Sequence, residues 1–222
     1  MPGLGDRRGE RLARARLYVV TGAREEQGDL GTFLSAVLEG GADIVQLRAK
    51  EAEAGELLRW STEFRAAADR YGALFVMNDR PDVAVAAGAD GVHLGQNDLP
   101  PAAARALIGP EMLIGLSTHS SGEFDAGAPE ADYLCVGPLY ATPTKPGRPA
   151  TGLEIVTHAA RRRRDGTETR PWFAIGGIDA VLLPGIIEAG ATRIVVVRAV
   201  AGSDPAASVK ALQGVLTKFP VS

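Results

Sequence analysis

Short apolar runs alternate with longer amphipathic stretches along almost the whole chain. The apolar runs are continuous and rich in Val, Ile and Leu, which is typical of strands buried on both faces of a parallel sheet. They therefore predict strands that lie inside the molecule. The runs fall at residues 17–21, 44–48, 74–77, 91–94, 112–116, 133–136, 172–175 and 194–197.

The stretches between the runs carry apolar residues near helical spacing, so a helix is predicted after each strand. Glycine-containing phrases at 40–43, 87–90 and 189–192 separate a helix from the next strand. We expect these phrases to serve local packing and to carry no chemistry. The predicted helices cover residues 29–39, 53–71, 81–87, 100–108, 121–126, 152–164, 179–189 and 204–217.

Eight alternating strand–helix units predict a single (β/α)8 barrel with parallel strands inside and helices outside. An open, doubly wound sheet is the alternative, but no G-x-G-x-x-G motif follows the first predicted strand. A length of 222 residues suits one such barrel. We expect residues 1–16, which are rich in Gly and Arg, to form a flexible arm and residues 17–222 to form one barrel domain.

The composition argues against several classes of protein. A formal net charge of −3 gives no reason to expect nucleic acid or an anionic membrane as partner. No apolar run is long enough to span a membrane, and the N-terminal residues lack the apolar centre of a signal peptide. We therefore expect a cytoplasmic protein. The single cysteine, Cys135, excludes an internal disulfide and is predicted to be a small buried residue within a strand.

Polar residues gather where the predicted strands end, whereas the edge where the strands start is much poorer in them. In a barrel of this type the active site lies at the C-terminal ends of the strands, so this asymmetry is the strongest physical signal in the sequence. The polar or glycine residues at these ends are Gln46, Arg48, Lys50, Asn78, Asp79, Arg80, His93, Gln96, Asp98, Ser117, Thr118, His119, Thr142, Thr144, Lys145, Gly176, Gly177 and Arg198.

Asp79 and Asp98 follow neighbouring strands and are expected to face each other at the mouth of the barrel. Carboxylate oxygens without a thiolate partner suit Mg²⁺, which takes phosphate oxygens as further ligands. Three cations, Arg48, Lys50 and Lys145, also come to this end, and together with the carboxylates they favour a diphosphate site. The alternative is that the two aspartates are ordinary turn residues or surface ion pairs.

A second anion site is predicted after the last two strands. Gly176 and Gly177 allow backbone N–H groups to approach a phosphate, the helices that follow add their dipoles, and Arg198 adds a charge. The segment 142–147 holds two hydroxyls and one ammonium between prolines that restrict its backbone. Taken alone, it fits a surface turn as well as a phosphate loop.

Six motifs in combination resemble the thiamine-phosphate synthase family, over about residues 17–216. They are Gln46-Leu47-Arg48-Ala49-Lys50, Asn78-Asp79-Arg80, His93-Leu94-Gly95-Gln96-Asn97-Asp98-Leu99-Pro100, Gly115-Leu116-Ser117-Thr118-His119, Gly137-Pro138 with Thr142-Pro143-Thr144-Lys145, and Ile175-Gly176-Gly177-Ile178.

The resemblance implies a transferase that condenses 4-amino-2-methyl-5-(diphosphooxymethyl)pyrimidine with a thiazole monophosphate, or its carboxylated form, and releases pyrophosphate. It implies dissociative chemistry through a pyrimidinyl-methyl cation, Mg²⁺ held by Asp79 and Asp98, and a homodimer as a possible assembly. The pyrimidine diphosphate would be bound by Gln46, Leu47, Arg48, Ala49, Lys50, Asn78, Ser117 and Lys145, of which Arg48, Lys50, Ser117 and Lys145 would be catalytic. The thiazole phosphate would be bound by Thr142, Pro143, Thr144, Gly177, Val197 and Arg198.

Two other functions remain open at this point. A related thiazole tautomerase would move a proton, with His119 as acid and base, and would leave Asp79 and Asp98 without a task. A sensor that binds a phosphorylated ligand would have no need to stabilise a leaving group, which the set of cations and carboxylates at the strand ends is suited to do.

Overall fold

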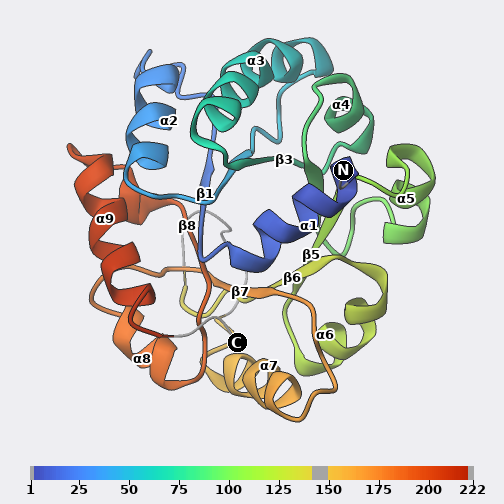
Figure 1. Ribbon diagram of the computed structural model, residues 1–222, viewed down its shortest axis with the longest axis vertical. Helices are drawn as coiled ribbons and strands as arrows, with labels where there is room; N and C mark the ends of the chain where they lie inside the picture. Colours follow the sequence, from blue (N-terminus) through green and yellow to red (C-terminus); the bar gives the residue numbers. More distant parts are fainter. Residues whose placement is uncertain (1–2, 142–149, 220–222) are drawn as a thin grey trace.

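The strands of the computed structural model, which describes residues 3–141 and 150–219, form a closed parallel barrel with helices around it (Figure 1). Each strand pairs with its neighbours in sequence, and the pairing of β1 with β8 closes the ring. The predicted (β/α)8 barrel is thereby confirmed. The strands are β1 Leu17–Thr21, β2 Ile44–Leu47, β3 Leu74–Asn78, β4 Gly91–Leu94, β5 Leu113–Thr118, β6 Tyr133–Val136, β7 Trp172–Ile175 and β8 Ile194–Val196.

Most helices lie within a few residues of their predicted bounds. The α-helices are α1 Leu4–Arg14, α2 Leu30–Glu39, α3 Ala54–Tyr71, α4 Pro81–Ala86, α5 Pro101–Ile108, α6 Ser121–Gly127, α7 Glu154–Arg164, α8 Leu183–Glu188 and α9 Pro205–Leu216, and the 3₁₀ helices are η1 Ala128–Glu130 and η2 Arg198–Val200. The largest difference is at α8, which was expected to begin at 179. Asp179 Oδ1 accepts from the backbone N–H groups of Val181 and Leu182, both at 2.9 Å, and residues 180–182 form a turn ahead of the helix. Pro184, at the start of α8, has no N–H to bond back to this turn.

Two hydrophobic clusters divide the core. The larger lies between the strands and the surrounding helices. The smaller fills the barrel and includes the rings of Tyr18, Tyr133 and Phe173. Phe173 meets the two tyrosines edge-on, with ring centroids 5.7 and 5.8 Å apart. The described residues contain no helix with the length and apolar character needed to cross a membrane.

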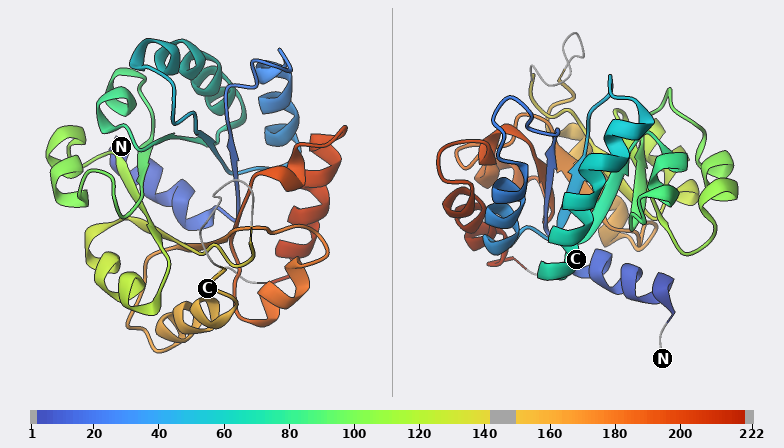
Figure 2. Two further views of the ribbon diagram at one scale, coloured as in Figure 1. Left: turned by 180° about the vertical axis from the view of Figure 1, so that it is seen from behind. Right: turned by 90° about the horizontal axis from the view of Figure 1, so that it is seen from above.

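Residues expected to form a flexible arm instead form helix α1, which lies across the end of the barrel where the strands start (right view of Figure 2). Leu12 and Ala15 pack into the cluster inside the barrel. Arg8 is only 8% exposed, and its Nε lies 3.0 Å from Asp90 Oδ1. The prediction of flexibility was wrong because the Gly- and Arg-rich composition does not reveal this partner, which lies far along the chain.

The strand-start edge is also richer in polar contacts than the sequence suggests. Asp43 Oδ2 accepts from the N–H of Leu17 at 3.0 Å, Asp90 Oδ2 from Phe75 at 2.9 Å, and Asp132 Oδ2 from Ile114 at 2.7 Å. Each aspartate precedes an even-numbered strand and binds the start of the strand before it. Asp43 and Asp90 belong to the glycine-containing phrases at 40–43 and 87–90, so these two phrases help to join neighbouring strands.

We predict that Asp90→Ala lowers the free energy of unfolding by about 3–5 kcal/mol, because it leaves buried cationic groups and the Phe75 N–H without their partner. Asp90 binds both Arg8 and Arg65, the latter at 2.8 Å. The matched control is Asp69→Ala, which removes a 67% exposed partner of the same Arg65 and should cost less than about 1 kcal/mol. Urea unfolding measures both, and equal losses would contradict the prediction.

Candidate active site

Two adjoining cavities open at the C-terminal ends of the strands, with volumes of about 350 and 260 Å³. Five residues line both cavities, so the two spaces meet along a common wall. These shared residues are Ser117, His119, Ile175, Val195 and Val197.

The larger cavity brings together most of the predicted diphosphate residues. Those lining it are Gln46, Arg48, Lys50, Asn78, Asp79, Asp98 and Ser117. Leu47 and Ala49 do not line it: the Leu47 side chain is fully buried in the cluster between strands and helices, and Ala49 packs against the same cluster. Thr142, Pro143, Thr144 and Lys145 lie outside the described residues, so their expected contacts stay predictions.

Asp79 and Asp98 meet at the mouth of this cavity, as the sequence predicts. Asp79 has a φ of 63°, a left-handed conformation that few residues other than Gly, Asn and Asp adopt, and its N–H donates to His93 O at 2.9 Å. Asp98 Oδ2 accepts from the Gly95 N–H at 2.7 Å. A Cβ on Gly95 would lie 2.9 Å from that oxygen, so the glycine permits the close approach.

The two carboxyl groups share a hydrogen bond, and their environments separate their pKa values. Burial, reinforced by the hydrogen bond to Asp98, raises the pKa of Asp79 even though Lys50 Nζ lies 2.9 Å from its Oδ2. Burial also acts to raise the pKa of Asp98, but the hydrogen bonds from Asp79 and the Gly95 N–H outweigh it and the net shift is downward. As the pH rises, Asp98 therefore gives up its proton before Asp79 does.

The two neighbouring carboxyl groups could hold a divalent cation. Carboxylate oxygens are the ligands that Mg²⁺ prefers, and the donor set contains two of them side by side. Within the described part of the chain, no third Asp, Glu, His or Cys joins them to make a metal-ligating group. Waters or phosphate oxygens would have to complete the coordination, which is usual for Mg²⁺ bound together with a phosphorylated ligand.

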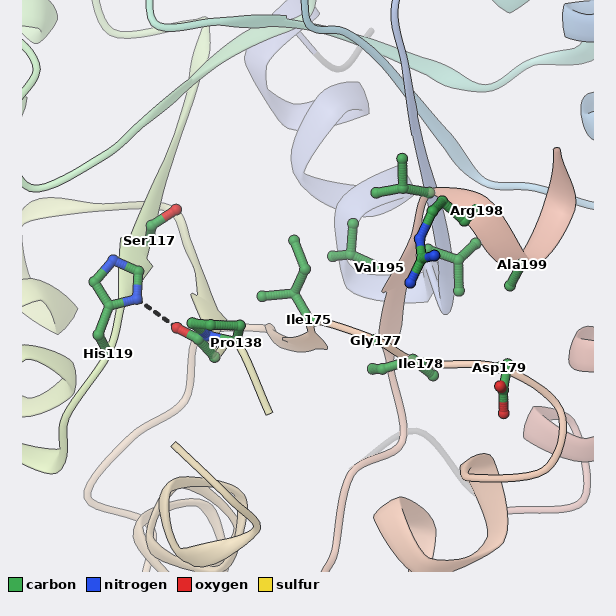
Figure 3. A pocket seen from close by; sticks show the side chains of 14 residues that line it. Ser117, His119, Pro138, Ile175, Gly177, Ile178, Asp179, Val195, Arg198 and Ala199 are labelled. Carbon is green, nitrogen blue, oxygen red and sulfur yellow. Dashed lines mark hydrogen bonds between the residues drawn. The ribbon is translucent and has the colours of Figure 1, made fainter. Parts of the chain in front are cut away.

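The smaller cavity is built around the turn after β7. Gly176 and Gly177 have φ values of 107° and 70°, conformations that glycine adopts readily. In Figure 3 the Arg198 guanidinium, from the start of η2, points inward toward the loop that carries Gly177. Helix α8 begins only at Leu183, beyond the residues that line the cavity, whereas η2 begins at Arg198, which lines it. The expected contribution of the helix dipoles stays a prediction. At this cavity, the backbone N–H groups of the glycine turn and the guanidinium of Arg198 are suited to bind an anion.

His119 lies on the wall between the cavities, where Figure 3 shows its ring beside Pro138. Its Nδ1 donates to the Gly137 carbonyl oxygen, and its backbone N–H donates to Glu123 Oε2 at 2.7 Å. Cys135 is 1% exposed within β6, as the sequence predicts, and it borders the larger cavity.

The floor of the larger cavity contains a chain of hydrogen bonds, called here the buried relay, that the sequence did not reveal. It consists of Gln46, Tyr18, Tyr133, His93 and Ser117. Gln46 Nε2 donates to the Tyr18 hydroxyl, which lies 3.1 Å from the Tyr133 hydroxyl. The Tyr133 hydroxyl lies 3.3 Å from His93 Nδ1, and His93 Nε2 lies 2.9 Å from Ser117 Oγ. Burial raises the pKa of both tyrosines far above the ordinary value, so both hydroxyls keep their protons.

Comparison with known proteins places the chain in a defined group. The family model for thiamine monophosphate synthase matches residues 17–200. The thiamine-phosphate synthase of Acidothermus cellulolyticus is 54% identical over 198 residues, covering 88% of this chain and 92% of that protein. That of Mycobacterium tuberculosis is 52% identical over 219 residues, covering 93% and 97%. The structure of thiamine phosphate pyrophosphorylase from Pyrococcus furiosus has a TM-score of 0.81 and 30% identity, covering 94% of this chain and 98% of that one.

We predict that Gly115→Ala destabilises the fold by at least about 2 kcal/mol through overpacking. A Cβ at this position in β5 would lie 2.1 Å from Tyr133 Cζ and 2.5 Å from His93 Nδ1, so both relay side chains would have to move. Gly185→Ala is the control, because its Cβ meets nothing within 4 Å, and it should change stability by less than about 1 kcal/mol. The midpoint of thermal unfolding measures the stability of both variants, and an unchanged midpoint for Gly115→Ala would refute the prediction.

Proposed function

Because the chain belongs to the thiamine monophosphate synthase family, we propose that it joins 4-amino-2-methyl-5-(diphosphooxymethyl)pyrimidine to a thiazole monophosphate, or its carboxylated form, and releases pyrophosphate. Members of this family are transferases of thiamine biosynthesis, and this chain is such an enzyme. The observation that carries the choice of substrates is the pair of adjoining cavities, one with cations and paired carboxylates and the other with a glycine turn and Arg198.

The larger cavity would hold the pyrimidine diphosphate. Gln46 lies on its floor and suits the ring, whereas Arg48 and Lys50 suit the diphosphate. Asn78 and Ser117 add uncharged hydrogen-bonding groups between them. The backbone of Leu47 and Ala49, rather than their side chains, would take part, and Lys145 completes the proposed set.

Asp79 and Asp98 would hold Mg²⁺. The fit rests on two hard oxygen donors that lie within hydrogen-bond distance of each other, next to the cation of Lys50. When bound, Mg²⁺ supplies positive charge that neutralises the diphosphate. Lys50 would then be released from Asp79 to contact phosphate oxygens.

Cleavage of the C–O bond would give a pyrimidinyl-methyl cation, which the thiazole nitrogen then captures with its lone pair. Catalysis of this kind needs stabilisation of the departing pyrophosphate more than it needs a nucleophile or a strong base. Arg48, Lys50, Ser117 and Lys145 would provide it, and each well-placed donor contributes about 3 kcal/mol, or roughly 10²-fold in rate. The common wall of the two cavities would bring the thiazole nitrogen close to the reacting carbon.

The thiazole phosphate would occupy the smaller cavity, held by Gly177, Val197 and Arg198 together with Thr142, Pro143 and Thr144. A tautomerase would use His119 for proton transfer and give no role to the paired carboxylates. The carboxylate pair and the relatives named above favour the synthase. The decisive assay mixes both substrates with Mg²⁺ and looks for thiamine phosphate and pyrophosphate, and absence of both products would refute the proposal.

We predict that Asp98→Ala lowers kcat/KM at saturating Mg²⁺ by about 10²-fold or more, because one of the two proposed metal ligands is lost. The fold should remain, since Asp98 lies on a half-buried loop. Asp82→Ala is the control: this carboxylate, also close to the end of β3, is 58% exposed and paired with Arg80, and its loss should leave activity within about twofold. Full activity of Asp98→Ala without added metal would remove the Mg²⁺ assignment.

We also predict that Arg198→Ala raises KM for the thiazole phosphate by about tenfold or more, since a charged hydrogen bond is worth about 1.5–3 kcal/mol. KM for the pyrimidine diphosphate should stay within about twofold. Arg59→Ala, which removes a guanidinium from a 62% exposed side chain on α3, controls for the change in overall charge. A rise in KM for the pyrimidine diphosphate alone would assign Arg198 to the other cavity.

A further inference from the structure

We propose that the buried relay fixes the direction of hydrogen bonding at both of its ends. Gln46 would present its amide oxygen Oε1 as an acceptor for the pyrimidine, and Ser117 would present its hydroxyl hydrogen as a donor to the diphosphate. Tyr18, Tyr133 and His93 would be positioning residues that act through these two. The inference rests on the proposed function only for the identity of the ligand.

The direction of the relay follows from the donors at its Gln46 end. The amide nitrogen of Gln46 can only donate, so the Tyr18 hydroxyl accepts from it. Tyr18 has a single hydrogen, and the Tyr133 hydroxyl lies 3.1 Å away to accept it. Tyr133 in turn donates its own hydrogen to the next member of the relay.

His93 continues the hydrogen-bond direction to Ser117: it accepts from Tyr133 and donates to Ser117. Its Nδ1 accepts from Tyr133 at 3.3 Å, so the ring hydrogen is on Nε2, which donates to Ser117 Oγ at 2.9 Å. The Ser117 hydroxyl therefore accepts inside the floor, and its one hydrogen is left to donate to a ligand in the cavity that it lines.

Burial makes a break in this order costly. Gln46 is 3% exposed and Ser117 5%, while both tyrosines are fully buried. A relay in which one member reverses and its neighbours do not would place two donors or two acceptors opposite each other, and one of them would stay unpaired among buried side chains. The five side chains also come from five different strands, so the rigid barrel fixes their spacing. Gly115 in β5 leaves the room that the Tyr133 and His93 rings occupy.

The fixed direction selects a ligand by its hydrogen-bonding pattern. An acceptor at Gln46 suits a ring that carries an amino group, and it opposes a ring that carries an oxo group at the same position. A donor at Ser117 suits a leaving diphosphate, whose oxygens gain negative charge as the C–O bond breaks. The relay would thus serve specificity at one end and departure of pyrophosphate at the other.

The first test is a double-mutant cycle between Tyr133→Phe and Ser117→Ala. Tyr133→Phe alone removes one hydroxyl and keeps the ring, and it should lower kcat by about tenfold with KM for the thiazole phosphate unchanged. In the Ser117→Ala background the same substitution should change kcat by less than about twofold, because its effect passes through Ser117. Full, additive effects in both backgrounds would overturn the proposal.

Phe173→Leu is the matched control, since Phe173 packs against both relay tyrosines but makes no hydrogen bond in the relay. It should lower the unfolding midpoint and leave kcat within about twofold. If kcat falls as far as in Tyr133→Phe, packing alone explains the effect and the relay has no directional role. Should Tyr133→Phe fail to fold, Tyr18→Phe tests the Gln46 end: it should reduce the preference for the amino-pyrimidine over its oxo analogue, and an unchanged preference would count against the proposal.

A measurement on the ligand-free protein separates this inference from the proposed function. Nitrogen-15 NMR of the His93 ring should show the hydrogen on Nε2, and Tyr133→Phe should produce a mixture of the two tautomers. A hydrogen on Nδ1 in the unsubstituted protein would overturn the relay even if thiamine phosphate is formed. The expected tautomer without any product would leave the relay standing and refute the proposed reaction.

Discussion

A closed ring of parallel strands shields its interior from water except at the two ends, and this constraint decides where polar groups can lie. A polar side chain that points inward must reach an end or find a partner inside. At the strand-start end Asp90 forms an ion pair with Arg8, and helix α1 covers the opening. Within the barrel, the hydroxyl groups of Tyr18 and Tyr133 form a hydrogen bond with each other. At the opposite end, polar groups face two cavities, and the chemistry of the molecule is concentrated there.

The fold could be predicted because strands buried on both faces give continuous apolar runs that are visible without knowledge of their partners. The same continuity hides which side chains point inward. Tyr18 and Tyr133 lie inside the barrel, whereas their neighbours Val19 and Leu134 face the helices, yet all four belong to uninterrupted apolar runs. The buried relay therefore could not be predicted, and helix α1 was missed because its contact with Asp90 joins distant parts of the chain.

The position of the site was predictable for a different reason. Parallel strands bring all their C-terminal ends to one opening, so order along the chain is enough to place Asp79 and Asp98 together. Their local geometry was not predictable, because it depends on the left-handed conformation of Asp79 and on the N–H of Gly95. Helix α8 shows the same limit, since a turn over residues 180–182 separates its start at Leu183 from the glycine turn.

Helix α1 has a consequence for how the protein can be handled. It lies at the opposite end from both cavities, so a tag or surface linker attached before Gly3 would leave the mouth of the barrel open to ligands. A shortened chain that begins at Leu17 would lack helix α1 and therefore the cover over this end of the barrel. It would expose the apolar residues at the strand-start end of the barrel that Leu12 and Ala15 now cover. An exposed apolar patch of this kind favours aggregation during expression. Residues that look dispensable in the sequence thus belong to the packed core of the barrel.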